Sequence, residues 1–364
     1  MTLARRILIS AIAVAGIVLL AFAALAPTVL RDFAVRMPTD IDKQNSLAGT
    51  GDLLDRTSIY DSGPIRIDTA LPLRITAGTV SEPGPSGDEI VIRNKSLGTK
   101  PGPDGSAVEF SSGTESVTVD RADRVVVSTP EPMLQSPATA QAKPAPTRVG
   151  TYFTFPANTP RADVPYFDTA TQTPVTARYV PDERTIDGLE TVHFHFEVIG
   201  HDMAESPAVG QPTRLTLPAS KWGLADDDEP VTLKLYYTMV QDIWVEPVTG
   251  SVLDTVLRPR SYFAGSPDDP QAVVVYTGEL RFTPETVASL AQTAGDGRDM
   301  IRLIFVQLPI AAGISGVLLI ALAVLLAVRG RRRAAGPASR AEVPVGPVLG
   351  DGRDGRAEPV VSGA

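Results

Sequence analysis

The sequence predicts a mainly β (β-rich α+β) region flanked by two transmembrane helices. Two long apolar stretches, one near each end of the chain, predict the helices. Between them, apolar residues recur mostly at every second position, which is the period of a half-buried strand. Proline and glycine clusters separate these alternating segments, as turns and loops do. With 364 residues, the chain is long enough for one large domain or two medium ones.

The first predicted element is a membrane helix over residues 7–30. It follows Arg5 and Arg6 and contains no charge until Arg31, a pattern that signal peptides and membrane anchors share. Two small-x-small triplets have the form of a cleavage site, but Pro27 disfavours cleavage after the second of them. We therefore expect an uncleaved signal anchor with residues 1–6 in the cytoplasm, and cleavage is the alternative.

The second predicted membrane helix covers residues 303–328. At about 1.5 Å per residue it is longer than the roughly 30 Å hydrocarbon core of a bilayer. Arg329 and Arg331–Arg333 follow it, and the positive-inside rule then places both termini in the cytoplasm. We expect a two-pass plasma-membrane protein with an extracytoplasmic region over 31–302 and a disordered cytoplasmic tail over 329–364.

The region 31–302 is expected to be β-rich and to form two lobes, at 37–129 and 150–295. A proline-rich stretch over 130–149 shows no hydrophobic period and is predicted to link them. In the second lobe, the segment TVHFHFEVI alternates apolar and polar residues, which predicts a strand with Phe194 and Phe196 on one face. The segment EPVTG ends in Gly250 and predicts a turn between two further strands.

A short helix is predicted to follow the last strand of this region. Thr283, Pro284 and Glu285 supply a hydroxyl cap, a proline in the first turn and an acidic side chain near the positive end of the helix. Apolar residues follow at helical spacing, and Gly295 and Gly297 are expected to end the helix before the membrane span.

Composition argues against several classes of function. The formal net charge is −9 although both ends of the chain are basic, so the region between the spans is more acidic still. Such a region repels nucleic acid, because a phosphate backbone requires a basic surface. The chain contains no cysteine, which excludes disulfides, thiol nucleophiles and thiolate metal sites.

Candidate metal ligands are few. His193 and His195 lie on one face of a predicted strand, at a spacing that suits a metal, but a solvent-facing polar stripe is the simpler interpretation. The run from Asp226 to Glu229 lacks the alternating order of a calcium loop and is expected to be a solvated loop. We expect no metal site and no cofactor.

No motif of enzymatic chemistry is present. The sequence contains neither a G-x-S-x-G elbow nor a phosphate-binding G-x-x-x-x-G-K loop, so no catalytic residue is predicted and we expect a non-enzymatic protein. The weak candidates for ligand binding are the aromatic residues Tyr152, Phe155, Tyr166 and Phe167. They suit either the lining of an apolar groove or ordinary core packing.

Five segments together resemble a known family: YFTFP, VPYFDT, DGLETVHFHFEV, WVEPVTGSVLD and LRFTPETVASL. They are similar to an actinobacterial two-helix envelope family of uncharacterised role, often labelled the porin PorA family. The resemblance covers both apolar stretches and most of residues 150–333, and it is fainter over 37–127. It implies an envelope location and assigns no residue a role.

We therefore expect a membrane-anchored protein of the cell envelope. Its main predicted role is that of a non-enzymatic binding or scaffold protein, with the lipid bilayer and a lipid or other envelope component as partners. The alternative is a porin-like or transport-associated protein. An outer-membrane pore requires a closed barrel with a lipid-facing apolar band, whereas helices flanked by arginine are typical of an inner membrane.

Overall fold

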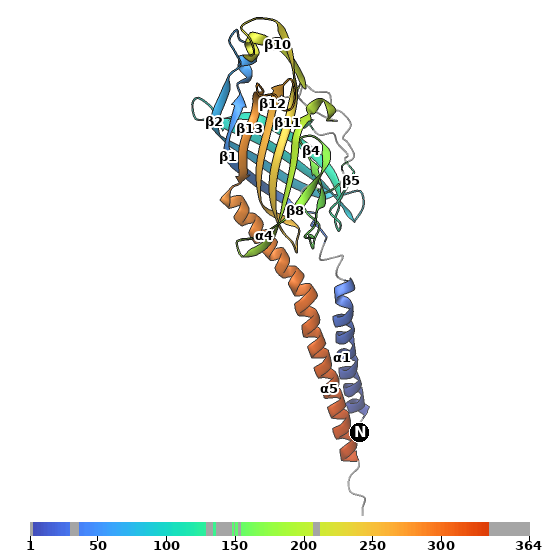
Figure 1. The fold of residues 1–364 in the computed structure, drawn as a ribbon. Coiled ribbons are helices and arrows are strands. Elements are labelled where there is room, and N and C mark those ends of the chain that lie inside the picture. Colours follow the sequence, from blue (N-terminus) through green and yellow to red (C-terminus); the bar gives the residue numbers. More distant parts are fainter. Residues whose placement is uncertain are drawn as a thin grey trace, which may run out of the picture. The chain divides into compact units, whose positions relative to one another are not determined.

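A computed structural model describes residues 3–29, 36–128, 134–135, 148, 150–151, 154–206 and 212–334 (Figure 1). The chain divides into two compact units, one formed by Met1–Phe22 with Ala312–Ala364 and the other by Ala23–Ala311. The first contains most of the two long apolar helices and the second contains the strands. The mainly β fold and the long apolar helix near each end of the chain are confirmed.

The strands form a single antiparallel path. Its order is β5-β4-β3-β2-β1-β13-β12-β11-β9-β8-β7, with β10 added on β11 and β6 on β4. The bounds are β1 Asp42–Leu54, β2 Ile67–Pro83, β3 Glu89–Pro101, β4 Ala107–Asp120, β5 Val126–Ser128, β6 Leu134–Gln135, β7 Val164–Asp168, β8 Thr173–Ile186, β9 Leu189–Asp202, β10 Arg214–Pro218, β11 Pro230–Glu246, β12 Ser251–Ala264 and β13 Val273–Phe282.

Pairing of the first strand with the last joins both predicted lobes in one sheet. β1 lies against β13 in a register that sets Leu47 opposite Phe282, so each strand covers an edge that would otherwise expose unpaired backbone groups. The division at 37–129 and 150–295 stays a prediction. Most of the linker predicted over 130–149 lies outside the described residues.

The predicted turns and strand faces are confirmed. Phe194 and Phe196 are buried on one face of β9, and the turn between β11 and β12 ends in Gly250 with a positive φ of 72°. A side chain at this glycine would collide with the carbonyl oxygen of Phe155, because an added Cβ would lie 2.1 Å from it. Glycine therefore serves both the turn conformation and the close approach.

The sheet curls so that its last strand meets strands near its other end. Phe167 of β7 packs in a buried cluster with Ile90 of β3 and Val117 of β4. The largest cluster is separate from this one and includes Phe155, Phe194, Phe196 and Ile243. Burial of Phe167 against the distant strands β3 and β4 thus stabilises the curl of the sheet.

The helix after β13 is longer than predicted. α4 spans Pro284–Arg302 and begins, as expected, with the Thr283 side chain accepting a hydrogen bond from the backbone N–H of Thr286. The predicted end at Gly295 and Gly297 is wrong, because α4 continues through a π-helical turn, η3 Leu303–Gln307, into α5 Leu308–Ala334. A glycine inside a helix costs only about 1 kcal/mol, and a Cβ at Gly297 would lie just 3.3 Å from the Thr249 methyl group.

The other helices of the described residues are α1 Leu3–Val29 and the short η1 Arg56–Ile59, η2 Met203–Glu205 and α3 Ala219–Trp222. Within the described residues, two helical stretches are long and apolar enough to cross a membrane, Leu3–Ala26 and Pro284–Arg329. The predicted span over 303–328 falls within the second stretch, whereas the span predicted over 7–30 extends four residues beyond the end of the first.

Candidate functional site

The aromatic candidates lie in the core of the sheet where the structure describes them. Phe155 is fully buried, and its ring stacks on Phe194 at 4.7 Å and on Tyr166 at 6.0 Å between centroids. Tyr166 also contacts Phe196, at 5.1 Å, and burial raises the pKa of its hydroxyl. Tyr152 lies outside the described residues.

Phe167 belongs to a different cluster from the other aromatic candidates. It is 1% exposed and lies under the guanidinium group of Arg148, which is 5.2 Å from the ring centroid. Arg148 in turn forms a buried ion pair with Glu115 of β4, at 3.1 Å. The structure thus brings Phe155 and Tyr166 together and places Phe167 elsewhere. Ligand binding by this set stays a prediction.

The two strand histidines share one carboxylate on the opposite face of the sheet from Phe194. Asp242 Oδ1 lies 3.0 Å from His193 Nε2 and 2.9 Å from His195 Nδ1. Burial raises the pKa of Asp242, but hydrogen bonds from His195, Arg258 and His193 outweigh it and leave the pKa lowered. Burial likewise lowers the pKa of His195, and its bonds to Asp242 and Glu197 reverse the sign and raise it.

This charged network extends across neighbouring strands. Arg258 of β12 contacts Asp242 Oδ2 at 2.8 Å and Glu279 of β13 at 3.0 Å, while His195 Nε2 lies 3.1 Å from Glu197. The side chains of Glu197 and Glu279 are 53% and 66% exposed. The network is therefore solvated at its glutamates, but the solvent-facing stripe predicted for the histidines is wrong for His193, which is 8% exposed and stacks on Trp244.

Among the described residues, no group of three or more metal-ligating side chains gathers at one point. The acidic run near α3 instead caps local backbone and hydroxyl groups. Asp227 accepts from the backbone N–H of Glu229 at 3.2 Å, and Asp228 accepts from the Ser220 hydroxyl at 2.9 Å. These carboxylates thus have structural partners in the loop.

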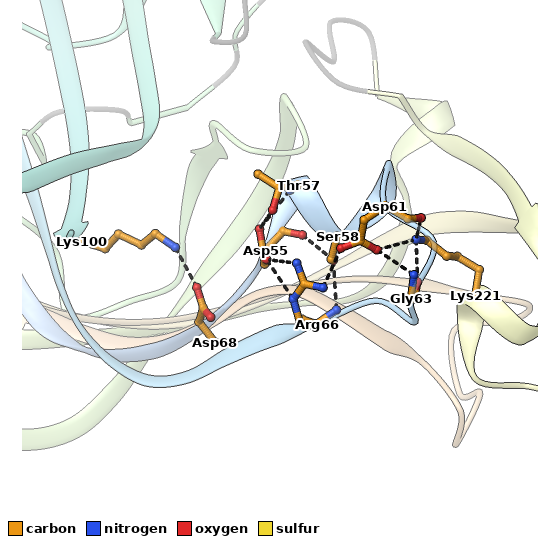
Figure 2. Close-up of polar contacts among 9 residues, drawn as sticks. All are labelled: Asp55, Thr57, Ser58, Asp61, Gly63, Arg66, Asp68, Lys100 and Lys221. Atoms are coloured by element: carbon orange, nitrogen blue, oxygen red, sulfur yellow. Dashed lines mark hydrogen bonds and ion pairs between the residues drawn. The ribbon is translucent and has the colours of Figure 1, made fainter. Parts of the chain in front are cut away.

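A polar latch joins the connection between β1 and β2 to α3 (Figure 2). Lys221 is 8% exposed and donates to the backbone carbonyls of Asp61 and Gly63 and to the Asp61 carboxylate. Arg66 bridges Asp61 at 2.6 Å and Asp55 at 2.8 Å. Hydrogen bonds from Thr57 and then Arg66 lower the pKa of Asp55 to about 2. Lys221 also lines a groove of about 330 Å³.

A second polar tie involves Arg124, in the turn between β4 and β5. Its guanidinium Nη1 donates to the carbonyl of Phe155, at 3.1 Å, and to the carbonyl of Thr249 in the turn between β11 and β12. Burial lowers the pKa of Arg124 to about 10. One side chain thus joins the turn between β4 and β5 to the turn between β11 and β12 and to the segment before β7.

The larger groove, of about 660 Å³, lies between the start of α4 and the edge of β12, β13 and β1. Arg184 and Arg281 both line it and share the Oδ2 atom of Asp254, at 3.2 and 3.4 Å. Asp254 is buried, with 3% of its side chain exposed, whereas the arginine side chains are 40% and 57% exposed. Arg184 also lies 4.8 Å from the centre of the Trp244 ring.

The apolar helices of the first unit touch backbone to backbone. A Cβ added at Gly16 would lie 2.9 Å from the Gly316 carbonyl oxygen, and one added at Gly316 would lie 2.8 Å from that of Gly16. Arg5 of α1 donates to the carbonyl of Leu326 in α5, at 3.3 Å. The pair is therefore antiparallel, with the arginine-bearing ends of both helices together.

Sequence reasoning missed the latch, the Arg124 tie and the large groove. Arg184, Asp254 and Arg281 stand on three different strands, and nothing in their local sequence marks them as neighbours. The signal that was available is the Thr283 helix cap, which locates one end of the groove. Locating the other walls requires the strand order.

Comparison with known proteins identifies the family. The chain is similar to a protein named Porin PorA from Corynebacterium amycolatum, at 28% identity over 158 residues, which cover 39% of this chain and 40% of that protein. The match therefore spans less than half of the relative's length. The family described as Porin PorA matches residues 9–325, which include most of α1, all the described strands and most of α5. The chain belongs to the Porin PorA family.

Proposed function

We propose that this chain is a porin-like, transport-associated protein of the cell envelope, anchored by α1 and α5 in the plasma membrane. The observation that carries the proposal is the family match over residues 9–325, because it includes both apolar helices together with the sheet. The proposal assigns no catalytic residue.

The helix pair supports a two-pass topology. Neither apolar segment, 7–29 or 308–328, contains an ionisable residue, and a helix in lipid satisfies its own backbone hydrogen bonds. Contact of Arg5 with the Leu326 carbonyl supports an arrangement with both basic ends on one side. The positive-inside rule assigns that side to the cytoplasm, so the strands are extracytoplasmic.

The charged face of the sheet argues that its strands lie outside the lipid. Strands of a membrane barrel present an apolar band to the bilayer, whereas β9, β11, β12 and β13 present the network of His195, Asp242, Arg258 and Glu279. Charges at such positions are costly in hydrocarbon. In this proposal the strands form a domain at the membrane surface, and only the helices enter the bilayer.

The helix pair of one copy leaves no lumen between its helices. The backbones at Gly16 and Gly316 are too close to admit even a methyl group. In this proposal a permeation path lies between the helix pairs of several copies.

Planar-bilayer recording of the purified full-length protein tests the transport role. We expect discrete conductance steps that depend on protein density, and their loss in Gly316→Leu, which separates the helices. Ala311→Leu, at an exposed position of the same helix, is the matched control and should conduct. Silence of the wild-type protein, with insertion verified by protease protection, would contradict the transport role.

A binding or scaffold role is the second candidate, and the filled interior of the sheet favours it. The rings of Phe155, Phe194 and Tyr166 occupy the space that a conducting barrel would leave open. If the wild-type protein does not conduct, an anchored domain that binds an envelope component accounts for the same fold. Retention of a defined envelope component by the immobilised protein would then be its direct test.

A further inference from the structure

We propose that the groove beside α4 binds a small anionic amphiphile. Its acidic headgroup lies between Arg184 and Arg281, and its apolar chain lies along Phe282 and Val287. This site goes beyond the transport role, because it lies wholly within the unit Ala23–Ala311 and requires no conducting path.

The size of the groove suits a small molecule. Ligand sites commonly enclose about 300–1,000 Å³ and combine apolar walls with a few convergent polar groups. This groove measures about 660 Å³ and takes its apolar wall from Phe282 of β13 and from Pro284, Val287 and Ala288 of α4. Its polar groups come from β8, β12 and β13, which converge at one end of α4.

Two guanidinium groups supply the anion recognition. Each carries five N–H donors in a rigid fork, and each forms an ion pair with the same oxygen of Asp254. Asp254 is almost fully enclosed, whereas both arginines remain partly exposed. The ring of Trp244 lies against Arg184 and restricts its movement. The fork is thus oriented before a ligand arrives, which lowers the entropic cost of binding.

The backbone N–H groups at the start of α4 already have acceptors within the protein and contribute little to anion binding. The backbone N–H of Thr286 donates to the Thr283 hydroxyl, and that of Val287 donates to the Thr283 carbonyl. Pro284 has no N–H to offer. Recognition of the acid therefore depends on the arginine pair.

One further carboxylate opposes an anionic ligand. Asp187, in the turn between β8 and β9, also lines the groove and is exposed. Its charge repels an acid at the arginine pair, so removing it should strengthen binding. Asn tolerates the left-handed backbone found at this position, where φ is 47°, so Asp187→Asn changes the charge with little strain.

The test uses Trp244 as the reporter. The chain has two tryptophans, and a Trp222→Phe background leaves only the one that contacts Arg184. Full-length protein in nanodiscs of phosphatidylcholine is titrated with octanoate, octyl phosphate, inorganic phosphate and octyl glucoside. We expect a saturable change in Trp244 emission with octanoate, octyl phosphate or both. A response to only one distinguishes a carboxylate headgroup from a phosphate headgroup.

Four variants locate the response in the groove. Arg281→Gln should raise the dissociation constant roughly tenfold, because a charge-assisted hydrogen bond is lost, and Asp187→Asn should lower it. Ala288→Phe, at an exposed position that lines the groove, should block the chain. Arg260→Gln lies on β12 outside the groove lining and should bind as the parent does.

Several results would overturn the proposal. One is that neither octanoate nor octyl phosphate produces a saturable change in Trp244 emission. Another is that octyl glucoside or inorganic phosphate changes this emission as much as the two acids do. Unchanged binding in both Asp187→Asn and Ala288→Phe would overturn it as well, and these surface substitutions decide the matter even if Arg281→Gln fails to fold. The titration is independent of conductance, so binding without conductance removes the transport role and leaves this site in place.

Discussion

Replacing Arg124 with alanine should lower the free energy of unfolding of the β unit by about 2–4 kcal/mol. Its Nη1 atom donates to the carbonyls of Phe155 and Thr249, and a hydrogen bond from a charged donor contributes about 1.5–3 kcal/mol. Part of this gain is offset in the native protein, because enclosing the guanidinium lowers its pKa to about 10. The two carbonyls that lose their donor account for the remaining cost.

Backbone conformation at Arg124 provides an internal comparison. Its φ is 59°, in the left-handed region that glycine adopts without strain. Arg124→Gly loses the same hydrogen bonds as Arg124→Ala but removes the strain, so it should be more stable than the alanine variant by about 1 kcal/mol.

Urea unfolding of the full-length protein in detergent measures both effects. Trp222 and Trp244 lie in the unit Ala23–Ala311, so their fluorescence reports the sheet and not the helix pair. Arg56→Ala serves as the control, because within the described residues its exposed side chain makes one hydrogen bond, of 3.4 Å. This substitution should change stability by less than about 0.5 kcal/mol. An Arg124→Ala variant as stable as the wild type, or no difference between the alanine and glycine variants, would refute the reasoning.

Three further outcomes are expected. Cysteines introduced at Leu20 and Gly316 should form an intramolecular disulfide in this otherwise cysteine-free chain, because a Cβ at Gly316 would lie 2.9 Å from Leu20 Cγ. If the double variant cross-links no more than the single variants, the contact between the helices is excluded. His195→Gln should destabilise the protein more at pH 6 than at pH 8.5. The pKa of His195 is raised in the folded protein, so the histidine adds stability at a pH below its pKa in the unfolded chain, and this stability is lost as the pH rises through its pKa in the folded protein. A loss of stability that does not depend on pH would contradict this. Lys221→Met should lower the free energy of unfolding in urea by about 1.5–3 kcal/mol, because three acceptors in the connection between β1 and β2 lose a charged donor. A decrease below about 0.5 kcal/mol, typical of a surface substitution, would show that the latch is not stabilising.

Local patterns predicted most of the secondary structure. The alternation around Phe194 and Phe196, the turn that ends in Gly250 and the cap at Thr283 all depend on residues close in sequence, where the physics of the chain is local. The end of α4 was mispredicted at Gly295 and Gly297. At this point α4 runs on through η3 into the long apolar helix α5. A single glycine does not end a helix when the residues on both sides remain helical, because it costs only about 1 kcal/mol.

The candidate sites were much harder to predict than the strands. Tyr166 and Phe167 are adjacent in sequence, yet they face different clusters, because successive side chains of a strand point to opposite sides. The groove at Arg184, Asp254 and Arg281 depends on side chains from β8, β12 and β13 meeting near one helix although β9 and β11 separate β8 from β12, and a single sequence contains no signal for that arrangement.

By itself the sequence determined the two apolar segments, their flanking arginines, the β-rich region between them and the absence of cysteine chemistry. These properties follow from residue type and short-range period, which act over a few neighbouring residues. Only the tertiary structure decided that β1 closes onto β13 and that Gly16 meets Gly316. It also decided that two arginines share one buried carboxylate beside α4. Each of these contacts joins residues far apart in the chain, and their pairing is selected by the packing of the whole core rather than by local preference.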